Sequence, residues 1–248
     1  MNPKERRAAR HQPPGPGASD VPRPRRRKTP LTPEHVVDTA LKVVAAEGYE
    51  ALTMRRLADA LDTGPASLYV YVKNTTELNA LLIDRYLVDL DLSWDDSELP
   101  RARLHRVLDD YTHLLTRQPG LAQAALVTWP NGVHYLDLLD LLLRLLHDLE
   151  LDTTTAARAV DLLLQHATAS AAERAAHASN NAQELSDLQS TLDAADPDRH
   201  PTLARAGSAV FVSGSREERN AWSIDVLIDG ALKHATQRRP TEGRSHSQ

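Results

Sequence analysis

The chain has 248 residues, of which 41% are hydrophobic and 25% are charged, as in a globular protein that buries a sizeable core. It contains no cysteine, which excludes disulfides, thiolate zinc sites and cysteine nucleophiles. Glycine and aromatic residues are few while Leu and Ala recur, so the composition favours helices and predicts an all-α fold.

Charge is distributed unevenly along the chain. The formal net charge is −5, yet the first thirty residues hold nine basic side chains against Glu5 and Asp20. A basic arm on an acidic body indicates an anionic partner at the N-terminal end. Residues 1–29, rich in Pro, Gly and Arg, are expected to be disordered. The basic run at 25–28 can contact DNA, although such a tail can also be a solvated segment without a role.

No segment of the sequence predicts a membrane span. The most apolar stretch, residues 136–151, is interrupted by Asp137, Asp140, Arg144 and Asp148, which is typical of a buried helix in a soluble protein. The first thirty residues lack the apolar segment of a secretion signal. We therefore expect a cytoplasmic protein without a membrane partner.

The first predicted helix begins after Thr32, a suitable N-cap, with Pro33 at its first position. It ends before Gly48, which can adopt the left-handed conformation that follows many helices. Between these ends, apolar residues recur at helical spacing, at Val37, Ala40, Leu41 and Val44.

Two short helices are predicted next. One begins at Thr53, and the other runs over residues 65–71 after the turn at 62–64. The first of them has three apolar residues on its inner face, Leu57, Ala58 and Leu61. Two short helices joined by a tight turn and flanked by longer ones form a helix-turn-helix.

A fourth helix is expected after Asn74, which forms a capping-box-like pair with Glu77, and it extends to about Leu92. From Pro100 onward the pattern is of longer amphipathic helices separated by Pro and Gly. Their approximate spans are 101–117, 121–128, 133–150, 153–178, 183–194 and 216–236. No period-2 stretch long enough for a strand and no internal repeat is found.

Residues 31–92 resemble the N-terminal domain of the TetR family of bacterial regulators. The resemblance is carried by ALKVVAAEGYEALTMRRLADAL at 40–61, by Ser-Leu-Tyr at 67–69 and by Lys-Asn at 73–74. The remainder is similar to the family's helical regulatory domain in outline, through the corner at 118–121, the alanine-rich helix and the terminal helix. This implies a helix-turn-helix DNA-binding domain at 30–92 and a helical ligand-binding and dimerisation domain at 93–248, with a disordered tail after about residue 237.

The second short helix is interpreted as the recognition helix. Helical spacing turns Leu68 and Val72 inward and leaves Ala66, Ser67, Tyr69 and Val70 outside, where they can reach base edges and phosphates. Few polar side chains are available there, so phosphate contacts should carry much of the affinity.

The resemblance implies that the start of the preceding helix also faces DNA. Arg55 is the best candidate for a bidentate contact to guanine, whereas Arg56 is interpreted as a surface or phosphate-facing residue. Many family members carry glycine where Asp62 stands and lysine where Thr75 stands. Lys73 can supply the phosphate contact in place of that lysine. The predicted DNA-binding residues are Thr53, Arg55, Arg56, Gly64, Ala66, Ser67, Tyr69, Val70, Tyr71 and Lys73.

The second half contains no catalytic constellation. It has no H-E-x-x-H pattern and no phosphate-binding glycine loop, so we expect no enzyme activity, metal or cofactor. A few polar groups among apolar helices suit a small-molecule pocket, although each alone can be a surface or core residue. The candidates are Tyr111, His113, Trp129, Asn131, His134, Tyr135, His166 and Thr168.

The helices at 153–178 and 216–236 occupy positions that form a four-helix dimer interface in the family. Alternatively, their apolar faces close the core of a single chain. The candidate interface residues are Val160, Leu163, Leu164, Trp222, Val226 and Ile228. A two-fold dimer would place two helix-turn-helix units on successive turns of DNA.

The leading hypothesis is therefore a homodimeric repressor that binds a palindromic double-stranded DNA operator and is released by a small-molecule effector. A second hypothesis is a DNA-binding module whose helical domain binds a partner protein instead. The third, a helical enzyme, has no support beyond scattered His and Asp residues. The sequence names neither the operator nor the effector.

Overall fold

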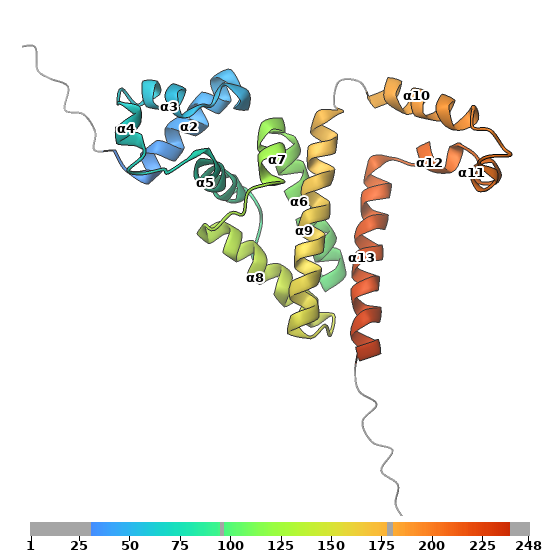
Figure 1. The fold of residues 1–248 in the computed structure, drawn as a ribbon. Coiled ribbons are helices and arrows are strands. Elements are labelled where there is room, and N and C mark those ends of the chain that lie inside the picture. The colour runs from blue at the N-terminus through green and yellow to red at the C-terminus, as the bar shows by residue number, and fades with distance from the viewer. Residues whose placement is uncertain (1–30, 95–96, 178–180, 239–248) are drawn as a thin grey trace, which may run out of the picture. The chain divides into compact units, whose positions relative to one another are not determined.

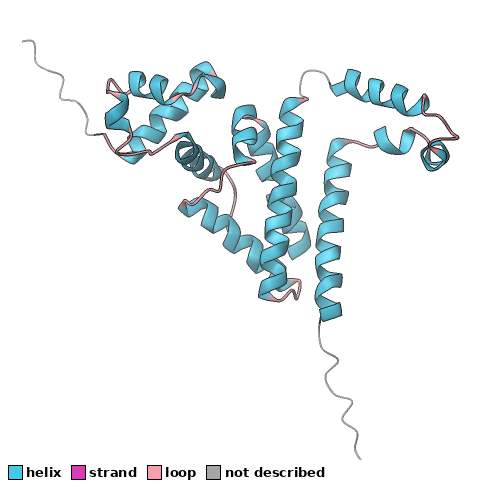
Figure 2. Ribbon diagram, viewed as in Figure 1, coloured by secondary structure: helices cyan, strands magenta, loops and turns pink. Residues whose placement is uncertain are grey.

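In the computed structural model, the described residues are 31–94, 97–177 and 181–238. Within these ranges every regular element is a helix, which confirms the all-α prediction (Figure 1, Figure 2). The predicted arm at 1–29 lies outside the described residues, as does nearly all of the predicted tail after residue 237.

Residues 31–94 contain four α-helices and one short 3₁₀ turn. These elements are α2 (Pro33–Glu47), η1 (Tyr49–Ala51), α3 (Met54–Ala60), α4 (Pro65–Leu68) and α5 (Thr75–Leu87). The short helices α3 and α4 pack together and α2 packs on both α3 and α5, so the predicted helix-turn-helix is present.

Three polar side chains begin these helices where the sequence predicted. Thr32 Oγ1 accepts a hydrogen bond from the His35 N–H at 3.2 Å, and Thr53 Oγ1 accepts one from the Arg56 N–H at 3.0 Å. Asn74 Oδ1 accepts from the Glu77 N–H at 2.8 Å. Each cap satisfies a backbone donor that has no partner within its own helix.

The fourth helix is shorter than predicted. It ends at Leu87 instead of about Leu92, and residues 88–90 form a turn. Directly after this turn, the Asp91 carboxylate accepts from the backbone N–H of Ser93 at 3.1 Å and from its hydroxyl at 2.5 Å. Side chains of this kind compete with helical hydrogen bonds, which a search for apolar periodicity does not detect.

The larger part of the chain is arranged around α9 (Thr153–Ala176), which contacts four other helices (Figure 1). These are α6 (Pro100–Thr116), α7 (Pro119–Ala125), α8 (Val133–Asp148) and α13 (Arg216–Arg238). The core between them is made mostly of leucine and alanine, because one face of each helix is apolar.

Along the chain, α9 is followed by three short or medium helices before α13: α10 (Asn181–Asp193), α11 (Pro201–Ala206) and α12 (Ala209–Val212). The sequence predicted only the first of them. The other two have six and four residues, too short for an apolar period of 3.6 to be recognised.

None of the helices in the described ranges combines the length and apolar character needed to cross a membrane. Among the same residues, no three His, Cys, Asp or Glu side chains come together in a way that could hold a metal ion.

Candidate functional site

Helix α4 presents the side chains predicted to read DNA. Leu68 and Val72 are fully buried against the neighbouring helices, as predicted from helical spacing. Tyr69 and Val70 are exposed, as are Ala66 and Ser67. The helix is preceded by exposed Gly64 and begins with Pro65, which suits a first helical position. The outer face of α4 is therefore open to a partner.

The two arginines of α3 have different surroundings. Arg55 is exposed and forms no ion pair within the described part of the chain. Arg56 instead donates from Nε to both carboxylate oxygens of Glu47, at 3.1 and 2.9 Å, and its Nη2 also contacts that carboxylate. This pairing lowers the pKa of Glu47 and ties α3 to the end of α2. The guanidinium of Arg56 is thus held beside Glu47, whereas that of Arg55 is exposed and forms no such pair.

The remaining predicted contact residues flank α3 and α4. Thr53 and Lys73 are exposed, and Tyr71 is half-buried. Thr75, at a position where many family members have lysine, is the first residue of α5 and is exposed. Asp62, at a position where many have glycine, has φ +47°, the left-handed region that glycine occupies most readily.

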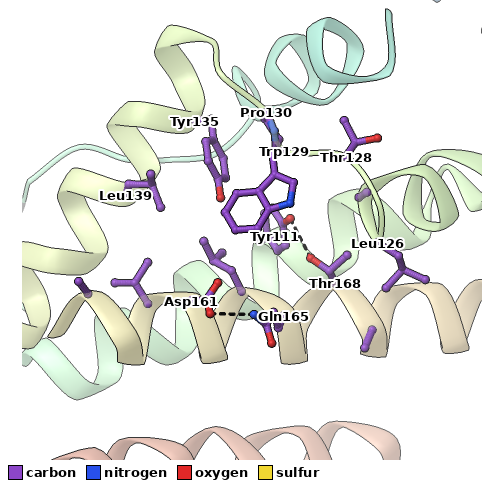
Figure 3. A pocket seen from close by; sticks show the side chains of 15 residues that line it. Tyr111, Leu126, Thr128, Trp129, Pro130, Tyr135, Leu139, Asp161, Gln165 and Thr168 are labelled. Carbon is purple, nitrogen blue, oxygen red and sulfur yellow. Dashed lines mark hydrogen bonds between the residues drawn. The ribbon is translucent and has the colours of Figure 1, made fainter. Parts of the chain in front are cut away.

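A cavity with a volume of about 590 Å³ lies among α6, α7, α8 and α9 (Figure 3). Of the eight predicted ligand-binding residues, four line it: Tyr111, Trp129, Tyr135 and Thr168. Its other lining residues are Ala125, Leu126, Thr128, Pro130, Leu139, Ala157, Val160, Asp161, Leu164, Gln165 and Ala169.

The other four predicted residues do not line this cavity. His113 is exposed and its Nδ1 lies 2.9 Å from the Asp109 carbonyl of its own helix, and Asn131 is exposed in the loop before α8. His134 lies beside Asp137 on α8, at 4.0 Å. His166 points toward α13, where its Nε2 lies 3.2 Å from Asn220 Oδ1. Proximity in sequence does not decide which face of a helix a side chain occupies.

The contribution of α9 to the cavity was mostly missed. Its lining residues fall at 157, 160–161, 164–165 and 168–169, the spacing of a single helix face. Within this apolar face, Asp161 and Gln165 are polar and one turn apart. This pattern in the sequence could have indicated that they line the cavity. The Gln165 Nε2 donates to Asp161 Oδ2 at 2.8 Å.

Both tyrosines of the cavity are held in the neutral form. Burial raises the pKa of Tyr111 to about 12, and its hydroxyl is joined to Thr168 Oγ1 by a 3.0 Å hydrogen bond. Burial, and then the nearby Asp161 carboxylate, raise the pKa of Tyr135. Both phenols therefore act as neutral hydrogen-bonding groups at physiological pH.

Comparison with known protein families agrees with this arrangement. The family model described as "Tetracyclin repressor-like, C-terminal domain" matches residues 100–234, which is more than half of the chain. The model described as "Bacterial regulatory proteins, tetR family" matches residues 36–80. The chain belongs to the TetR family.

Several known proteins are similar to the chain. The HTH-type transcriptional repressor DrrR1 of Streptomyces coeruleorubidus is 48% identical over 58 residues, which are 23% of this chain and 22% of DrrR1. The match therefore spans about a fifth of that repressor's length.

Two solved structures are similar over most of the chain. The putative transcription regulator SCO7704 from Streptomyces coelicolor is 42% identical, with a TM-score of 0.73, over 87% of this chain and 99% of that one. The TetR family protein ActR of Streptomyces coelicolor, solved in complex with actinorhodin, is 28% identical, with a TM-score of 0.73, over 84% of this chain and 99% of ActR.

In this TetR-family chain, the pocket helices are joined directly to the DNA-binding part. The Asp84 carboxylate of α5 accepts a hydrogen bond from the Tyr135 N–H, in the first turn of α8, at 2.9 Å. Gly132 precedes that turn, and a Cβ there would lie 2.0 Å from Asp84 Cγ. Asp84 thus caps α8 from another helix, while Tyr135 lines the pocket.

A second connection involves α7. The Tyr49 hydroxyl in η1 donates to Asn79 Oδ1 of α5 at 2.6 Å. Gly120, near the start of α7, packs so closely on the Tyr49 ring that a Cβ would lie 2.3 Å from its Cδ1. Both α7 and α8 therefore line the pocket at one point and contact the DNA-binding part at another.

The predicted dimer residues divide into two groups. Val160, Leu163, Leu164 and Ile228 are buried within the single chain, and Val160 and Leu164 line the pocket. Their place in a dimer interface stays a prediction. Trp222 and Val226 of α13 are 68% and 47% exposed. Leu162 on the neighbouring α9, which was not predicted, is also exposed.

Proposed function

We propose that this chain is a homodimeric transcriptional repressor that binds a two-fold symmetric DNA operator and is released by a small-molecule effector. The observation that carries the proposal is the pair of direct contacts from the pocket helices to the DNA-binding part, at Asp84 and Tyr49. The repressor name of DrrR1 and the actinorhodin complex of ActR support it by similarity.

The operator is read by α3 and α4. Arg55 contacts a guanine, Ser67 reaches a base edge or phosphate, and Tyr69 bonds a phosphate through its hydroxyl, since all three are exposed on these helices. The effector binds in the pocket and displaces α7 and α8. This displacement shifts α5 and, with it, the recognition helix α4.

Replacing Arg55 with alanine is expected to weaken operator binding by about 1–3 kcal/mol and to relax specificity at one position of each half-site. Fluorescence anisotropy on the operator and on its single-base variants measures both effects. Arg158→Ala is the matched control, because it removes the same charge from an exposed position of α9. If Arg55→Ala weakens binding equally on all DNA sequences, Arg55 contacts phosphate rather than a base.

The dimer forms through an exposed apolar face of α9 and α13 that includes Leu162, Trp222 and Val226. Trp222→Glu places a charge in this face and is expected to yield monomers in analytical ultracentrifugation, with weaker operator binding. Val127→Glu, which puts the same charge on a 77% exposed residue of the α7–α8 loop, should remain dimeric. A dimeric Trp222→Glu protein would rule out this face.

Selection of bound genomic DNA fragments tests the proposal as a whole. Recovery of a site with two-fold symmetry is expected, because each subunit of a dimer reads one half-site. Binding without sequence preference and with a steep salt dependence would favour instead the DNA-binding module that recruits a partner protein.

A further inference from the structure

The walls of the pocket are suited to a flat aromatic molecule. Three of its lining side chains are aromatic, Tyr111, Trp129 and Tyr135, and most of the others are aliphatic. Figure 3 shows the indole of Trp129 and the ring of Tyr135 projecting toward α9, with Asp161 and Gln165 on the opposite side. Aromatic side chains stack on extended ring systems, and a volume of about 590 Å³ accommodates a polycyclic ligand.

The pocket also has a defined charge. Asp161 is the one formally charged side chain among its described lining residues, which include no Lys, Arg or His. Gln165 donates to Asp161 Oδ2 and makes no hydrogen bond to Asp161 Oδ1. An ionised carboxylate has about four acceptor sites, so Asp161 can accept further hydrogen bonds from a ligand.

The two neighbouring phenols add no charge of their own to the pocket. The raised pKa values of Tyr111 and Tyr135 keep both groups protonated, so the pocket carries a single negative charge against apolar walls. Asp161 is exposed to solvent at the edge of the pocket. Its carboxylate attracts a cation and repels an anion bound beside it, with a strength that solvent screening reduces.

We propose that the effector is a flat polycyclic aromatic amine, whose rings pack against Trp129 and Tyr135 and whose protonated amine pairs with Asp161. This inference rests on the proposed function, in which the pocket is the effector site. It narrows that site to a chemical class: aromatic cations are preferred over neutral and anionic molecules of the same shape.

Three pyrene derivatives of nearly equal size test the preference: 1-pyrenemethylamine, 1-pyrenemethanol and 1-pyrenecarboxylate. Titration calorimetry with the full chain is expected to show the amine binding about fivefold more tightly than the alcohol, and the carboxylate binding least. Equal binding by all three overturns the charge assignment while leaving the pocket as a binding site. Failure of all three to bind overturns the proposed ligand class.

Asp161→Asn keeps the size of the side chain and removes its charge. It is expected to bring the affinity for the amine down to that for the alcohol, with little change for the alcohol itself. Asp140→Asn is the matched control, because Asp140 is exposed on α8 and does not line the pocket. A preference for the amine that survives in Asp161→Asn would overturn the role of Asp161.

Operator binding separates this inference from the function on which it rests. If the amine binds through Asp161 and lowers operator affinity, both stand. If the amine binds through Asp161 but leaves operator affinity unchanged, the ligand class of the pocket stands and the proposed release mechanism is wrong.

Discussion

Asp84→Ala is expected to yield a repressor that binds operator and ligand but no longer couples them. The Asp84 carboxylate joins α5 to the first turn of α8, where the bonded N–H belongs to the pocket residue Tyr135. Without it, a movement of α8 is transmitted to α5 only by packing. Coupling between two sites is typically about 5- to 150-fold in affinity, and we expect most of that factor to be lost.

The measurement is the operator dissociation constant with and without saturating 1-pyrenemethylamine. Gly132→Ala should have the same effect, since the added Cβ would lie 2.0 Å from Asp84 Cγ and push the carboxylate away. Asp89→Ala removes an exposed carboxylate just beyond the same helix and serves as the control. Wild-type coupling in both Asp84→Ala and Gly132→Ala would mean that α7, through Gly120 and Tyr49, carries the signal alone.

Arg103→Ala is expected to lower the free energy of unfolding by about 3 kcal/mol, the largest stability effect predicted for this chain. Arg103 begins the second turn of α6 and is 2% exposed. Its Nη2 donates to the carbonyl oxygens of Asp91 and Ser93, at 2.9 and 2.7 Å. Its Nη1 lies 3.3 Å from Asp91 Oδ2 and 3.5 Å from Glu98 Oε2. Removing this buried side chain takes the donor from both carbonyl oxygens and opens a cavity.

Chemical denaturation monitored by circular dichroism measures this loss. Arg106→Ala is the matched control, because Arg106 pairs with the same carboxylates, of Asp91 and Glu98, but is 38% exposed. Exposed ion pairs contribute about 1 kcal/mol or less, so this variant should change stability little. Similar losses in the two variants would show that charge pairing stabilises this region, rather than the hydrogen bonds of Arg103 to the backbone of Asp91 and Ser93.

The helix-turn-helix could be predicted from sequence because its signals are local. The caps Thr32, Thr53 and Asn74 accept hydrogen bonds from backbone groups within three residues of themselves, so neighbouring residues are enough to predict them. The outward face of α4 follows in the same way from helical spacing, with Leu68 and Val72 buried as expected.

The pocket was only partly predictable, because its walls come from four helices. Tyr111 and Thr168 are 57 positions apart yet share a hydrogen bond, and nothing near either residue indicates the other. His166 lies only two positions from Thr168, but that separation turns it toward α13 and away from the pocket.

The sequence by itself therefore determined the all-α class, the helix-turn-helix and the family, because helix caps, apolar spacing and turn residues act over a few positions. The tertiary structure alone decided that Arg56 is tied to Glu47, that Asp161 faces the pocket and that Asp84 caps α8. These contacts join residues from separate helices, and their partners are set by how those helices pack.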